Sequence, residues 1–154
     1  MVCILACFLR NYAEETAAPF EKALVAKAAI KQCARNHSGR TPGDSRIPSY
    51  SAIFDIPGNK EQAVDLVKST AQESGFSLQI DTSNRNNPDL LLVDKTKDSP
   101  YPDLEAGKII LLINVPEGKT YNGKGVNPCT VITDPNPPAN KTTIWINLNL
   151  PEYK

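Results

Sequence analysis

The sequence has little of the chemistry that catalytic sites use. It contains one histidine, His37, and its four cysteines include no Cys-x-x-Cys pair. A nucleophile with a histidine base would depend on His37, which lies in a stretch of turn and linker residues. The missing pair excludes thioredoxin-type redox sites and ribbon-type zinc sites. We therefore expect no catalytic residues and no cofactor.

Net charge is also absent, because 17 basic side chains balance 17 acidic ones. Without an overall positive field we expect no nucleic-acid partner. The balance is uneven along the chain, with seven basic against four acidic side chains in residues 1–46 and ten against thirteen in residues 47–154. Turn residues from Asn36 to Ser45 separate the two parts. The sequence therefore predicts an N-terminal helical arm and linker at 1–46 and a single α+β domain at 47–154.

A long apolar run is missing as well. The run from Met1 to Leu9 has nine residues, whereas a membrane span needs about 20 and a signal peptide starts with basic residues. Ile4-Leu5-Ala6-Cys7 is similar to a bacterial lipoprotein cleavage box, in which Cys7 would be acylated if the start is truncated. The alternative is the apolar first turn of a helix. The lipoprotein interpretation predicts a membrane tether at the N-terminus only, and a periplasmic or secreted protein rather than a cytoplasmic one.

Two segments have the composition and spacing of helices. The first extends from Ala13 to Arg35 and is rich in helix formers, and we expect it to begin near Pro19, which the first turn tolerates. The second covers residues 59–74, where Asn59 and Gln62 form a capping-box pattern and a glycine follows the last turn. Nine of the 13 prolines come after residue 87, so long helices are not expected there.

Alternating apolar and polar residues predict strands in the rest of the chain, namely 50–56, 76–81, 89–94, 108–115 and 142–150. The nearly unbroken apolar run at 108–115 predicts a central strand covered on both faces. Tyr121-Asn122-Gly123-Lys124 predicts a two-residue type I′ turn. Together these patterns predict an α+β fold, with a mainly antiparallel sheet of five to six strands, helices packed on one face and an N-terminal helical arm.

The cysteines leave three interpretations open. Cys3 and Cys7, and likewise Cys33 and His37, are four residues apart, so two helical segments could present three thiolates and one imidazole to zinc. Alternatively the cysteines are free, buried, small apolar residues. The third interpretation is a disulfide between Cys33 and Cys129 in an oxidising compartment, which would join the N-terminal helix to the sheet.

The last strand predicts a binding surface. If its even-numbered residues Ile144 to Leu150 face the core, Trp145 stands on the other face, and an amphipathic aromatic among amides and hydroxyls is typical of contact surfaces. The alternative is that the N-terminal arm, or the folded-back segment 116–129 that contains the predicted turn, covers Trp145. The proposed surface consists of Trp145, Asn147, Asn149, Thr143 and Tyr121, and the first two strands would add Ser51, Ile53, Asp55, Ser77, Gln79 and Asp81.

These features favour a small non-enzymatic binding module, exported or lipid-anchored in a bacterium, that engages a protein or polymeric ligand through an open sheet face. One alternative is a small carboxylate-dependent hydrolase or transferase that uses Asp98 and Asp103 with Lys119 or Tyr121. Another is a zinc-organised helical arm that acts as a metal or redox sensor.

Overall fold

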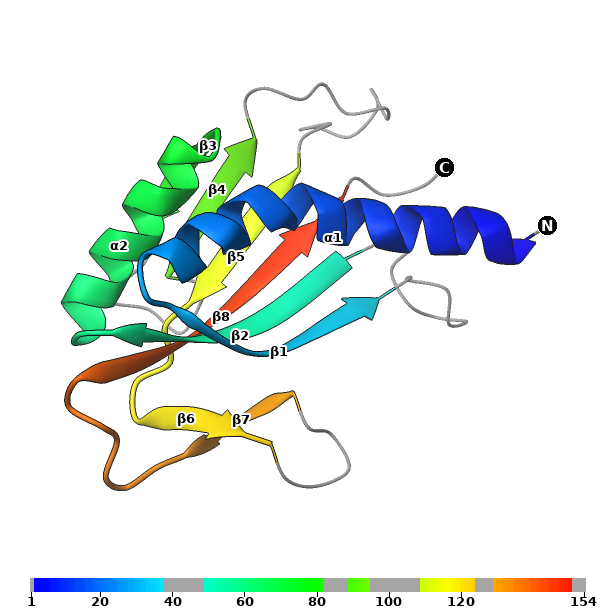
Figure 1. Ribbon diagram of the computed structural model, residues 1–154. Coiled ribbons are helices and arrows are strands. Elements are labelled where there is room, and N and C mark those ends of the chain that lie inside the picture. Colours follow the sequence, from blue (N-terminus) through cyan, green and yellow to red (C-terminus); the bar gives the residue numbers. More distant parts are fainter. Residues whose placement is uncertain (1, 38–48, 82–88, 95–108, 124–128, 151–154) are drawn as a thin grey trace.

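A computed structural model describes residues 2–37, 49–81, 89–94, 109–123 and 129–150 (Figure 1). It has the expected α+β architecture, with a six-stranded antiparallel sheet in the order β1-β2-β8-β5-β4-β3 and a separate two-stranded sheet, β6-β7. The elements in chain order are α1 (Val2–Ala26), β1 (Ile30–His37), β2 (Ser49–Pro57), α2 (Lys60–Glu73), β3 (Phe76–Asp81), β4 (Leu90–Asp94), β5 (Ile110–Asn114), β6 (Lys119–Asn122), β7 (Thr130–Thr133) and β8 (Lys141–Asn149).

Both helices lie on one face of the large sheet, which we term the helix face (Figure 1). The core forms there because alternate residues of each strand point to the helices. Phe20 of α1 meets Phe76 of β3 edge to face, with ring centroids 6.5 Å apart. Burial of each large apolar side chain stabilises the fold by roughly 1.5–3 kcal/mol. The fully buried members include Phe20, Leu24, Phe54, Ile56, Val67, Leu90, Leu92, Leu111, Ile113, Ile144, Ile146 and Leu148.

Helix α2 begins and ends as its sequence predicts. The Asn59 side chain accepts a hydrogen bond from the Gln62 backbone N–H at 2.9 Å, and the Gln62 side chain accepts one from the Asn59 N–H at 2.9 Å. This reciprocal capping box satisfies two N–H groups that the helix itself leaves without partners. Gly75, with φ of 96°, follows the last turn. The predicted helix at 59–74 is therefore confirmed.

The helix predicted from Ala13 to Arg35 is wrong at both ends. Helix α1 begins at Val2, so Pro19 lies inside it rather than in its first turn. It ends at Ala26 in a turn where Ala28 has a positive φ of 70°, and residues 30–37 form strand β1. The helix-forming composition of that strand is overridden by its backbone pairing with β2. The N-terminal segment therefore contributes a covering helix and an edge strand to the sheet.

Two details of the strand predictions also need correction. The turn predicted at Tyr121–Lys124 is wrong, because Asn122 pairs with Thr130 and the connection between β6 and β7 extends from Gly123 to Cys129. Strand β5 lies inside the sheet as expected, but its residues alternate between buried and half-buried. Side chains such as Leu112 are therefore half-exposed on the face opposite the helices.

Candidate functional site

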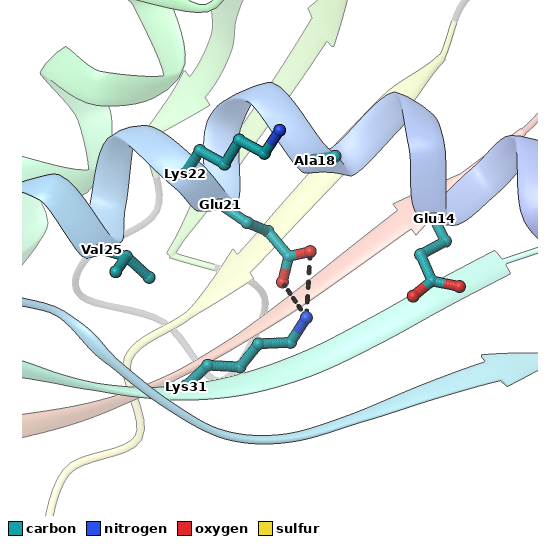
Figure 2. A pocket seen from close by; sticks show the side chains of 6 residues that line it. All are labelled: Glu14, Ala18, Glu21, Lys22, Val25 and Lys31. Carbon is teal, nitrogen blue, oxygen red and sulfur yellow. Dashed lines mark hydrogen bonds and ion pairs between the residues drawn. The ribbon is translucent and has the colours of Figure 1, made fainter.

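A cavity of about 380 Å³ lies between α1 and β1 (Figure 2). Its most buried polar group is the carboxylate of Glu21, which accepts hydrogen bonds from the Tyr50 hydroxyl at 2.9 and 3.0 Å. The Lys31 ammonium lies 3.1 Å from the same carboxylate and 5.4 Å from the centre of the Tyr50 ring. The residues that line the cavity are Glu14, Ala18, Glu21, Lys22, Val25 and Lys31.

A cluster of three side chains, Glu21, Tyr50 and Lys31, attaches α1 to the sheet. Burial, together with the negative charge of Glu21, raises the pKa of the Tyr50 phenol well above its ordinary value, so this side chain remains a hydrogen-bond donor. Both Glu21 oxygens accept hydrogen bonds from neighbouring donors. No sequence pattern indicated this cluster, because its three members come from α1, β1 and β2.

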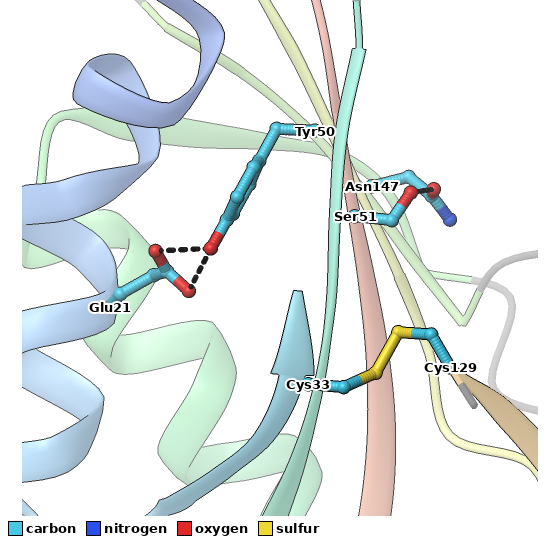
Figure 3. Close-up of a disulfide and its surroundings, with 6 residues drawn as sticks. All are labelled: Glu21, Cys33, Tyr50, Ser51, Cys129 and Asn147. Carbon is cyan, nitrogen blue, oxygen red and sulfur yellow. Dashed lines mark hydrogen bonds between the residues drawn. A yellow bond between two sulfur atoms is a disulfide. The ribbon is translucent and has the colours of Figure 1, made fainter. Parts of the chain in front are cut away.

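The second face of the sheet, opposite the helices, is termed here the outer face. Figure 3 shows Ser51, Asn147 and the disulfide on the outer face, with Glu21 and Tyr50 on the helix face. The alternation predicted for the last strand is confirmed, since Ile144, Ile146, Leu148 and Leu150 are buried in the core. Trp145, which has the opposite parity, exposes 40% of its surface.

Trp145 lies in a row of side chains that crosses the middle of the outer face. Its neighbours on the adjacent strands are Ile53 of β2 and Asn114 of β5, and Cys33 of β1 pairs with Ile53. Ile53 is only 2% exposed, so it is covered on this face too. Helix α1 lies on the other face and does not cover Trp145, whereas β6 contacts β8. The indole is therefore partly covered and partly open to solvent.

Amide side chains continue this row along β8. Asn147 and Asn149 are both half-buried, and they lie opposite the half-buried Leu112 and Ile110 of β5. The Ser51 hydroxyl donates a hydrogen bond to Asn147 Oδ1 (Figure 3). The Asn147 amide nitrogen remains available as a donor. The surface around Trp145 thus combines apolar area with amides, as the sequence predicted for β8, but the residues from β5 were missed.

At the start of β8, the residues of the outer face form a buried polar network. Asp55 is only 5% exposed, and its oxygens accept hydrogen bonds from Thr143 at 2.8 Å and Gln32 at 2.7 Å. Lys141 Nζ lies 3.4 Å from the same carboxylate. Thr143 does face outward, as predicted, but at 4% exposure it belongs to this buried network and not to the accessible surface. The negative charge of Asp55 is offset by Lys141.

A disulfide holds the two-stranded β6-β7 sheet beside the outer face. It joins Cys33 of β1 to Cys129, immediately before β7, with a Cα–Cα distance of 5.7 Å and a sequence separation of 96 residues. Of the three interpretations of the cysteines, the structure therefore shows the disulfide between Cys33 and Cys129. Cys33 and His37 lie on a strand rather than a helix, so the predicted zinc geometry is wrong. Within the described ranges, no three His, Cys, Asp or Glu residues group as metal ligands.

The other predicted site residues are dispersed. Tyr121 is half-buried and Lys119 is exposed on β6, whereas Asp98 and Asp103 lie outside the described residues. The β3 residues Ser77, Gln79 and Asp81 are separated from β2 by three strands, so they do not adjoin Trp145. Cys3 and Cys7 fall within α1, but their side chains, like that of His37, are outside the described part of the chain.

Comparison of the chain with models of protein families, with curated proteins and with solved structures gave no significant match. Neither described helix is long and apolar enough to cross a membrane.

Proposed function

We propose that the protein is a non-enzymatic binding module, exported or lipid-anchored in an oxidising compartment, that holds a polymeric ligand on its outer sheet face. The observation that carries the proposal is the exposure of the chain's single tryptophan, Trp145, among amides on the two central strands. Tryptophan combines a large apolar area with a polar N–H group, and it is enriched where proteins bind macromolecules.

The sheet is a suitable platform for such an anchor. Trp145 lies on β8, which pairs with β2 on one side and β5 on the other. Hydrogen bonds along both edges fix the backbone of β8, and the buried Ile53 is the cross-strand neighbour of Trp145. A rigid aromatic loses little conformational entropy on binding, so more of the contact energy contributes to affinity.

The Cys33–Cys129 disulfide supports the choice of compartment, because disulfides persist in secreted and periplasmic proteins and are rare in the cytosol of mesophiles. Acylation of Cys7 would add a tether at the end of α1 and would leave the outer face free. The buried carboxylates of Glu21, Asp55 and Asp89 each have neighbouring donors, which supports a structural role for them rather than acid–base catalysis.

The test is retention of the purified full-length protein on immobilised polymers, namely neutral polysaccharides, acidic polysaccharides and an unfolded protein. Trp145→Ala should abolish retention on the polymer that holds the wild type. Val25→Ala is the matched control, because Val25 is 52% exposed on α1, away from the outer face. Leu112→Lys places a charge beside the surface without removing the indole, and it should also weaken retention if the polymer that holds the wild type is neutral.

Circular dichroism must show that each variant is folded. Retention of Trp145→Ala and Leu112→Lys at wild-type levels would contradict the proposal. Failure of the wild type to bind any of the three polymer classes would contradict it as well.

A further inference from the structure

We propose that the ligand is a neutral glycan strand, which packs the C–H face of a sugar ring on Trp145 and bonds its hydroxyls to Asn114, Asn147 and Asn149. This inference rests on the proposed function and names the chemical class that the same surface fits. Three properties of the outer face carry it: the charges near the indole, the backbone of the strands beneath it and the unused hydrogen-bonding groups beside it.

The first property is that the side chains immediately around Trp145 are uncharged. Its neighbours across the strands are Ile53 and Asn114, and its neighbours along β8 on the same face are Thr143 and Asn147. The nearest carboxylate, Asp55, is buried and already paired with Lys141. An ionic group packed on the indole would lose hydration without an opposite charge beside it, which disfavours acidic and basic polymers alike.

The second property is that the strands under the indole are internal. Extended peptides usually bind sheets by adding a strand at an edge, where backbone N–H and C=O groups are free. Strand β8 is paired on both sides, so a peptide that lay across it would find only side-chain partners. Most backbone groups of the peptide would then face apolar residues such as Leu112 without a hydrogen bond, and this costs free energy.

The third property is a set of unused amide groups. Among the described residues, the side chains of Asn114 and Asn149 form no hydrogen bond, and Asn147 uses only its oxygen. Each amide offers both donors and acceptors, which suits hydroxyl groups that also do both. Trp145 and Asn149 are four residues apart on β8, about 13 Å at the usual rise per residue. This length accommodates more than one sugar ring.

The experiment measures binding of the full-length oxidised protein to four probes by calorimetry. Two are neutral, cellohexaose and chitohexaose; the third is an acidic oligogalacturonate, and the fourth is an uncharged Ser/Gly/Thr peptide of similar length. We expect binding of at least one neutral glycan, with the same affinity at about 50 and 500 mM NaCl, because no charges are involved. The single tryptophan should report the same event by a change in its fluorescence.

Variants locate the contact. Trp145→Ala should weaken glycan binding at least about tenfold, or about 1.4 kcal/mol, while Trp145→Phe should retain part of the affinity. Asn114→Ala and Asn149→Ala should each weaken it severalfold. The matched control is Asn136→Ala, which removes an exposed amide from the connection between β7 and β8.

The outcomes separate the two proposals. Binding of the peptide or the acidic glycan, but of neither neutral glycan, with loss in Trp145→Ala, would overturn the ligand class and leave the binding surface in place. Neutral-glycan binding that Trp145→Ala does not change would overturn both, as would the absence of binding to all four probes.

Discussion

Removal of the Cys33–Cys129 disulfide should destabilise the protein strongly. The bond closes a loop with a sequence separation of 96 residues. In the chain-entropy model, a crosslink across a loop of that length lowers the free energy of the native state relative to the unfolded state by about 4.7 kcal/mol, near the top of the usual range of 2–5 kcal/mol. We therefore expect the free energy of unfolding to fall by about 4 kcal/mol on reduction.

Urea unfolding with and without a phosphine reductant measures this effect. For an m-value of about 2 kcal/mol per molar urea, the midpoint should fall by about 2 M. The double variant Cys33→Ser/Cys129→Ser should match the reduced wild type and should not respond to reductant. The matched control is Cys3→Ser/Cys7→Ser, which should keep the full response.

Hydrogen exchange adds a local readout to the same experiment. Strands β6 and β7 pair only with each other among the described strands, so loss of the disulfide should speed amide exchange in β7 more than in β8. An unchanged urea midpoint on reduction, or four titratable thiols in the oxidised native protein, would show that no stabilising disulfide is present.

Three further substitutions test the packing that presents the outer face. Tyr50→Phe should lower the free energy of unfolding by about 1–3 kcal/mol at neutral pH because Glu21 loses a buried hydrogen-bond donor. Because the pKa of Tyr50 is raised in the folded state, its neutral form contributes stability that is present below about pH 10 and is lost above it. The free energy of unfolding of the wild type should then fall by up to about 1.4 kcal/mol per pH unit. Urea unfolding at alkaline pH should show this slope in the wild type and a smaller one in Tyr50→Phe. Asn59→Ala should lower the free energy of unfolding by about 0.5–2 kcal/mol through loss of the capping box, and an unchanged urea midpoint would contradict the capping geometry. Asp55→Asn should lower the free energy of unfolding by about 2 kcal/mol because it weakens the hydrogen bonds from Thr143 and Gln32. A thermal unfolding midpoint equal to that of the wild type would contradict a stabilising role for this network.

The features that the sequence predicted well depend on local signals. The capping box of α2 lies within four consecutive residues, so Asn59 and Gln62 identify the start of the helix by themselves. The parity of β8 follows from strict alternation over its whole length, and it placed Trp145 opposite the core-facing Ile144 and Ile146. These signals do not require knowledge of which strand is the neighbour.

The features that were missed depend on tertiary pairing. Half of the residues of strand β1 are strong helix formers, and its pairing with β2 makes it a strand. Glu21, Lys31 and Tyr50 meet because α1 packs over β1 and β2, an arrangement without a periodic sequence pattern. The burial of Thr143 likewise depends on its contact with Asp55, 88 residues away.

Glycan binding at Trp145 is tested most directly by quenching of its fluorescence with acrylamide, with and without the neutral glycan that binds in calorimetry. We expect the indole of the free protein to be readily quenched and saturating glycan to protect it, whereas oligogalacturonate should leave the quenching unchanged. An indole shielded from acrylamide in the free protein, or one that stays equally accessible when the glycan is bound, would show that Trp145 does not bind the glycan.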